Sequence, residues 1–142
     1  MMSKSELLKL AERVEAGSGE DRDLDIAILR VFNPDHVMFE DVSPDTSITF
    51  TDIGSEWKWN AFYRNGGVSI PFQKACSSLD AVEALRERLL PGSEYAISMA
   101  NNCAAHVWLD HFTNCDHVGH AETAPRAFLA ALLRAYAETV GG

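Results

Sequence analysis

The stretch EWKWNAFYRNGGVSIPF, residues 56–72, holds two alternating segments joined by a signal for a tight turn. Successive strand residues point to opposite faces, so the bulky residues of the first segment share one side. These are Trp57, Trp59, Ala61 and Tyr63. Asn65-Gly66 tolerates the positive φ angles of a short hairpin turn. The stretch therefore predicts an antiparallel hairpin, and Pro71 places its second strand at a sheet edge or near its end.

Working outward from this hairpin, apolar residues at helical or alternating spacing predict the other elements. The expected helices cover Lys4–Glu15, Asp21–Phe32, Leu79–Leu90 and a last segment that Thr123 caps. The other expected strands cover Ile48–Ile53, Tyr95–Met99 and Ala104–Phe112, with a short one near Val37–Phe39. Ser3 and Ser77 are the expected caps of the first and third helices, and the polar residues 113–122 form an expected loop.

This order of elements predicts one α+β domain over residues 1–142. Its centre is a mostly antiparallel sheet of about five strands, with helices packed on its faces as in an αβα sandwich. A chain of 142 residues with 46% hydrophobic content can bury a core of its own. Residues 1–10 lack a basic segment followed by an apolar one, and no apolar run is long enough to cross a membrane. We therefore expect a cytoplasmic protein.

Charge and cysteine content exclude some classes of function. The net charge of −9 disfavours nucleic-acid binding, because an acidic surface repels phosphates. Three cysteines without a CxxC pair indicate free thiols rather than a disulfide framework. Gly17-Ser18-Gly19 precedes a helix but lacks the Lys-Ser/Thr of a phosphate-binding loop, and the acidic residues 20–25 that follow would repel a phosphate.

Four of the five histidines fall between residues 106 and 120, together with other potential metal ligands. The candidate zinc ligands are His106, Asp110, Cys115, His117 and His120. Their spacing matches no paired CxxC or HExxH signature, so a polar loop with surface histidines is the competing interpretation. Cysteine catalysis by Cys103 or Cys115 is a further alternative, although both cysteines could equally be small buried residues.

Aromatic and basic residues supply a second candidate site, for a planar ligand. Aromatic rings stack on bases, and a nearby cation would hold a phosphate or carboxylate. The candidate ligand-binding residues are Trp57, Trp59, Tyr63, Arg64, Trp108 and Arg126. The alternation of the hairpin aromatics is equally what a strand needs when it packs against a core, and this competing interpretation stays open.

Three segments also carry a family resemblance. They are LAERVEA with GEDRDLDIAI (residues 10–16 and 19–28), CSSLDAV (76–82) and AETAPRAFLAALLRA (121–135). In this order they resemble small phage and prophage proteins of the phage ABA sandwich domain family. The resemblance implies a sheet between helical layers and carries over no catalytic motif. Residues 34–75 depart from the family and are an expected insertion that contains the hairpin.

Three hypotheses about function follow. The first is a non-enzymatic, phage-encoded binding protein of the host cytoplasm. It would sequester a small ligand, such as a nucleotide of host defence, or block a host protein; this phage setting comes from the resemblance. The second is a metal-dependent enzyme built on the 106–120 cluster. The third is a homo-oligomeric structural or assembly protein, which an exposed sheet edge would favour.

Overall fold

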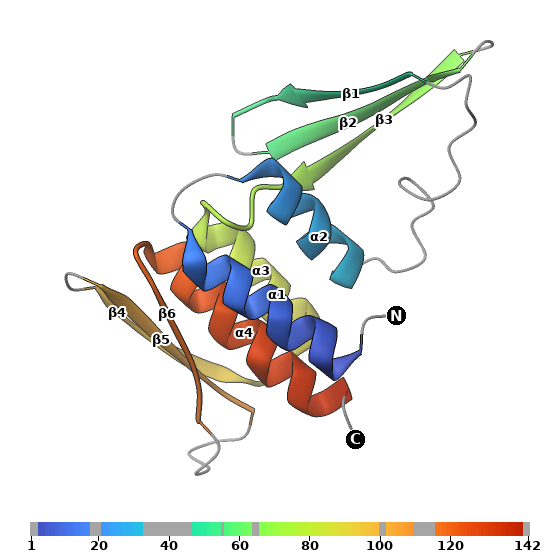
Figure 1. The fold of residues 1–142 in the computed structure, drawn as a ribbon. Coiled ribbons are helices and arrows are strands. Elements are labelled where there is room, and N and C mark those ends of the chain that lie inside the picture. Colours follow the sequence, from blue (N-terminus) through green and yellow to red (C-terminus); the bar gives the residue numbers. More distant parts are fainter. Residues whose placement is uncertain are drawn as a thin grey trace.

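The computed structural model describes residues 3–17, 21–32, 47–54, 56–63, 66–99, 102–109 and 116–140. The helices are α1 (Lys4–Ala16), α2 (Arg22–Phe32), α3 (Leu79–Leu89) and α4 (Ala124–Val140). The strands are β1 (Ser47–Asp52), β2 (Glu56–Tyr63), β3 (Gly66–Gln73), β4 (Glu94–Met99), β5 (Cys103–Trp108) and β6 (Asp116–Ala121). The α+β class is confirmed (Figure 1). The expected strand at 37–39 lies outside the described residues.

Side-chain caps begin three of the described helices, and at the start of α2 Asp21 Oδ1 accepts from the backbone nitrogen of Leu24 at 3.2 Å. Ser3 Oγ accepts a hydrogen bond from the backbone nitrogen of Glu6 at 3.2 Å, which confirms the cap expected for α1. The cap expected at Ser77 for α3 is wrong by one residue. Ser78 Oγ accepts from the backbone nitrogen of Ala81 at 3.2 Å, so Ser78 is the residue that satisfies the first turn of α3.

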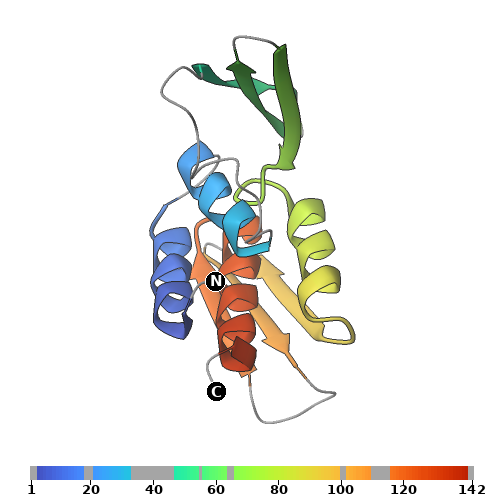
Figure 2. The same ribbon diagram turned by 90° about the vertical axis from the view of Figure 1, so that its right-hand side faces the viewer.

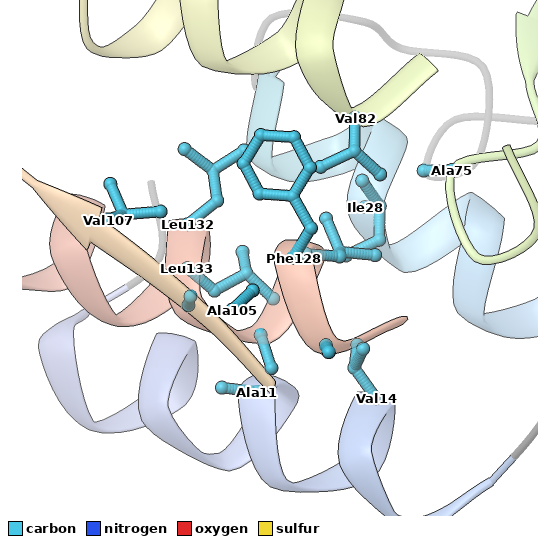
Figure 3. Packing of buried hydrophobic residues seen from close by; sticks show 14 of the residues in the cluster. Ala11, Val14, Ile28, Ala75, Val82, Ala105, Val107, Phe128, Leu132 and Leu133 are labelled. Atoms are coloured by element: carbon cyan, nitrogen blue, oxygen red, sulfur yellow. The ribbon is translucent and has the colours of Figure 1, made fainter. Parts of the chain in front are cut away.

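Helix α4 is the centre of the core. It lies between α1 and α3, and these three helices cover one face of the sheet β4–β6 (Figures 1 and 2). Phe128, Leu132 and Leu133 of α4 are fully or almost fully buried, and they pack toward side chains of β5 and the other helices (Figure 3). Residues on most sides of α4 are buried, so this helix packs against neighbouring elements around most of its circumference.

The expected single sheet of about five strands is wrong. The described residues form two antiparallel sheets of three strands, ordered β1-β2-β3 and β4-β5-β6. Helix α3 separates β3 from β4 along the chain. The second sheet packs on α4, whereas the first lies beyond α2 at the other end of the molecule (Figure 1). Strand β3 is an edge strand, in agreement with the position of Pro71.

Strand β6 falls inside the stretch expected to be a loop, so that expectation is also wrong. Its centre is Gly119, which is buried against α4. A Cβ atom there would collide with the backbone oxygen of Ala127 and would lie 2.7 Å from the backbone nitrogen of Ala131. The strand carries glycine because α4 approaches its backbone so closely, and this glycine also hides the strand's alternation in the sequence.

An ion pair covers the outer edge of β6. Arg134 of α4 donates two hydrogen bonds to the carboxylate of Glu15 on α1, at 2.5 and 2.7 Å. The same guanidinium donates to the backbone oxygen of Val118, and Glu15 accepts from the backbone nitrogen of His120, both at 2.7 Å. The pair thus satisfies the backbone groups of an edge strand and blocks further pairing there.

Acid should weaken this contact, and Glu15→Gln should remove the share of the pH dependence of stability that Glu15 contributes. Hydrogen bonding to Arg134 holds the pKa of Glu15 below its ordinary value, against the opposing effect of burial. A lowered pKa stabilises the fold above the unfolded-state pKa of about 4.3, and this stabilisation is lost as the pH falls through the folded-state pKa. We expect Glu15→Gln to cost about 1 to 2 kcal/mol at pH 7 and less at low pH, measured by urea unfolding. Glu12→Gln, which changes an exposed residue of the same helix, should lose little stability at either pH.

Candidate functional site

The face of the sheet β4–β6 that points away from the helices is called the outer face. On β5, Cys103, Ala105 and Val107 are buried toward α4, so the alternate residues occupy the outer face. Cross-strand register places the remaining residues of this face beside them. The outer face comprises Glu94, Ala96, Ser98, Ala104, His106, Trp108, Asp116, Val118 and His120. No helix that the structure describes covers this face (Figures 1 and 2).

A stacked aromatic pair lies on the outer face. The rings of His106 and Trp108 are 5.8 Å apart between centroids and only 13° from parallel. Both residues are partly exposed, and the stacking holds the indole of Trp108 in place. Glu94 on β4 and Asp116 on β6 are the two cross-strand partners of Trp108. The register therefore places an acidic position on each neighbouring strand beside the partly exposed Trp108.

The described members of the expected metal set do not all share one side of the sheet. His106 and His120 lie on the outer face, in neighbouring strands. His117 lies three residues before His120 on β6, so the two side chains point to opposite faces of the sheet and His117 points inward. Its Nε2 is buried without a hydrogen-bond partner among the described residues. In the described part of the chain no three His, Cys, Asp or Glu residues could hold a metal ion. Asp110 and Cys115 lie outside the described residues.

Trp57 belongs to a second group of side chains, the junction cluster, which joins β1–β3 to the helices. The cluster comprises Asp25, Asp52, Trp57, Lys74 and Cys76. Asp25 is 1% exposed, and it accepts from Trp57 Nε1 and from the backbone nitrogen of Cys76, each at 2.9 Å. Lys74 Nζ lies 4.5 Å from the Trp57 ring centroid and 2.7 Å from Asp52 Oδ1. These contacts engage both the N–H and the ring of Trp57, so its role in the fold is structural.

Burial sets the chemistry of the junction cluster. It raises the pKa of Asp25, against the opposing hydrogen bonds from Cys76 and Trp57. It also raises the pKa of Cys76, and the carboxylate of Asp25 beside the thiol acts in the same direction. Cys76 is therefore a protonated thiol at neutral pH, the opposite of an activated nucleophile. Cys103 is buried as well, which leaves neither described cysteine suited to catalysis.

Arg126 is buried too, at the end of α1. It is 2% exposed, and its Nη1 donates to the backbone oxygen of Val14 at 3.1 Å. Asp21 Oδ2 lies 4.0 Å from Nη2. An arginine beside the last carbonyl groups of a helix donates hydrogen bonds to them, and its positive charge is attracted to the partial negative charge at that helix end. Of the other expected ligand-binding residues, Trp59 and Tyr63 occupy β2, their side chains lie outside the described part, and Arg64 is wholly outside it.

Asp25 is the important residue that the sequence interpretation missed. It stands in the acidic run 20–25, a pattern that is typical of a solvated helix start. Its spacing held a signal, because it follows Leu24 directly and precedes Ile28 by three positions, and both of these residues are buried. A carboxylate placed within the apolar stripe of a helix is a candidate for a buried hydrogen-bonding role.

Comparisons with family models, with curated proteins and with solved structures found no match to this chain. The resemblance to phage ABA sandwich proteins thus stays a prediction that rests on the quoted segments. No helix among the described residues is both long and apolar enough to span a bilayer.

Proposed function

We propose that this chain is a non-enzymatic binding protein whose outer face receives a basic segment of a partner protein. The observation that carries this proposal is the stacked pair of His106 and Trp108 on an uncovered sheet face. In the phage setting that the resemblance implies, the partner is a host protein and the effect of binding is to block it.

Charge favours a cationic ligand at this face. A guanidinium or ammonium group is attracted to the face of an indole ring, and most strongly when carboxylates neutralise it. Glu94 and the Asp116 position flank Trp108, and the whole chain has a net charge of −9. Long-range attraction would therefore steer a basic segment toward this protein.

The shape of the outer face favours an extended segment. Ala96, Ser98 and Ala104 are small residues beside the aromatic pair, and the first two are exposed. Small side chains let a partner backbone come close to the sheet, while Trp108 supplies the aromatic anchor that is typical of interfaces.

The same residues argue against the nucleotide alternative at this face. A phosphate needs cationic or backbone donors. The outer-face positions named above include neither lysine nor arginine. Arg134, near the edge of β6, already binds Glu15 and Val118. Of the two ligand classes expected from sequence, a protein is therefore the better match.

A labelled hexa-arginine peptide is a suitable first probe of this surface. We expect the protein to bind it in low salt, and Trp108→Ala to weaken binding about tenfold, since a desolvated cation–π contact contributes about 1 to 2 kcal/mol. Glu94→Gln should weaken binding about threefold through loss of one flanking charge. Fluorescence anisotropy of the peptide measures both effects.

Glu87→Gln is the matched control, because it removes the same charge from an exposed side chain on α3, away from the outer face. It should leave the affinity close to that of the wild type. Equal affinities of wild type, Trp108→Ala and Glu94→Gln would reject the outer face as the binding surface. Trp108-dependent binding of mononucleotides without binding of the peptide would instead favour the small-ligand alternative.

A further inference from the structure

The two edges of the sheet β4–β6 differ in protection. Glu15 and Arg134 cover the edge of β6, as described above. Strand β4 forms the other edge and pairs only with β5. Within the described residues, Tyr95–Met99 make no backbone hydrogen bond other than those to β5. Proteins usually protect such an edge with charge, proline or a covering element, and residues 95–99 carry neither a charged side chain nor a proline.

The register identifies which backbone groups of β4 point outward. Val118 and His120 of β6 use their backbone groups toward Arg134 and Glu15, so the odd-numbered residues of β6 bond to β5. Their partners Cys103, Ala105 and Val107 are the odd-numbered residues of β5. The even-numbered residues of β5 consequently bond to Glu94, Ala96 and Ser98 of β4. The N–H and C=O groups of Tyr95, Ile97 and Met99 therefore face the open edge.

We infer that this edge pairs with the β4 strand of a second copy of the chain, antiparallel and around a two-fold axis at Ile97. Ile97 then forms a hydrogen-bonded pair with Ile97 of the second copy, and Tyr95 pairs with Met99 on either side of the axis. The outward-pointing backbone N–H and C=O groups of all three residues of each copy then have hydrogen-bond partners, and the two three-stranded sheets become one sheet of six strands. The arrangement is closed, because among the described residues each copy has this one open edge in the second sheet.

The side chains of β4 suit this pairing. Tyr95, Ile97 and Met99 lie on the helix-facing side of the sheet, yet Tyr95 is 39% exposed and Met99 is 72% exposed. In the paired register each Met99 lies directly opposite a Tyr95, so a thioether meets an aromatic ring and both lose solvent exposure. On the outer side Ala96 meets Ser98, two small neutral residues. No pair brings like charges together, which matters for a chain of net charge −9.

Disulfide trapping tests the register. With Cys103 and Cys115 changed to alanine to remove competing thiols, Ile97→Cys should form a covalent dimer on mild oxidation. The Cα atoms of a hydrogen-bonded antiparallel pair lie about 5.5 Å apart, within disulfide range. Ala96→Cys is the matched control, because residue 96 opposes residue 98 and not itself. We expect Ile97→Cys to cross-link at least about tenfold faster than the more exposed control. Equal rates, or a faster control, would contradict the register.

Sedimentation equilibrium tests the association without cysteine changes. The wild-type chain, of 15.6 kDa, should associate to twice that mass. Met99→Asp should raise the dimer dissociation constant at least about tenfold. Because the Met99 side chain is highly exposed, the variant should fold like the wild type, which circular dichroism checks. Leu8→Asp, which places the same charge at a 37% exposed residue of α1, should leave the constant unchanged. A wild-type monomer at all concentrations, or equal effects of the two variants, would overturn the inference. Neither assay involves a basic ligand, so the outcome is independent of the proposed function.

Discussion

Gly119→Ala should be one of the two most destabilising single changes in this protein, with a loss of about 3 kcal/mol in the free energy of unfolding. The added methyl group would meet the backbone of α4 at Ala127 and Ala131, and backbone atoms cannot rotate away as a side chain can. Strand β6 and helix α4 would have to separate, which also weakens the packing around Leu132 and Leu133. Urea unfolding followed by circular dichroism measures the loss.

Gly54→Ala separates this steric effect from the general cost of replacing a glycine. Nothing lies within 4 Å of a Cβ atom at Gly54, but its φ of +93° strains any other residue. We expect a loss of about 1 kcal/mol for this strain alone. If both variants lost the same stability, the close approach of β6 to α4 would not be the reason for glycine at position 119.

Asp25→Ala should cost about 3 kcal/mol, because it leaves one part-buried and one buried donor without an acceptor. These donors are the indole N–H of Trp57 and the backbone nitrogen of Cys76. Their loss would free the sheet β1–β3 from α2, so the effect should include a change in the environment of Trp57. Urea unfolding gives the free energy, and tryptophan fluorescence of the folded variant reports the local change.

Two further variants sharpen this test. Asp23→Ala removes an exposed carboxylate from the same turn of α2 and should change stability by less than about 0.5 kcal/mol. Asp25→Asn keeps one carbonyl oxygen as an acceptor, so its loss in the free energy of unfolding should lie between those of Asp23→Ala and Asp25→Ala. Similar stabilities for Asp23→Ala and Asp25→Ala would show that the junction cluster does not anchor the sheet.

Local signals predicted most elements of the fold. The Ser3 cap, the apolar stripe of α1 and the turn after Tyr63 each depend on residues close in sequence, and α1 and β2 appear where those signals place them. Strand β3 begins slightly earlier than expected, because Gly66, expected in the turn, already pairs with Tyr63. The division into two sheets could not be predicted in this way. Strand pairing depends on contacts between residues that are distant in the sequence. The packing of α4 on β4–β6 likewise depends on the fit between distant surfaces, which a local sequence pattern does not describe. The sequence did not indicate strand β6 because the central one of its inward residues is Gly119, which carries no side chain.

The candidate site was predictable in residue type but not in arrangement. Trp57, Trp108 and Arg126 are all candidate ligand-binding residues, and within the fold Trp57 makes a part-buried hydrogen bond and Arg126 a buried one. Only Trp108, among these three, lies on an uncovered face. Sequence alone could not separate them, because an aromatic residue in an alternating segment has the same local pattern whether its face meets a helix or solvent.

The most direct test of the proposed function follows the three indole N–H groups by NMR. Protein labelled with ¹⁵N-tryptophan would be titrated with the hexa-arginine peptide, and single Trp→Phe variants would assign the signals. The account predicts that the Trp108 signal shifts progressively with peptide, while the Trp57 signal, held by Asp25, stays in place. A shift of Trp57 with no response of Trp108 would contradict the outer face as the binding surface.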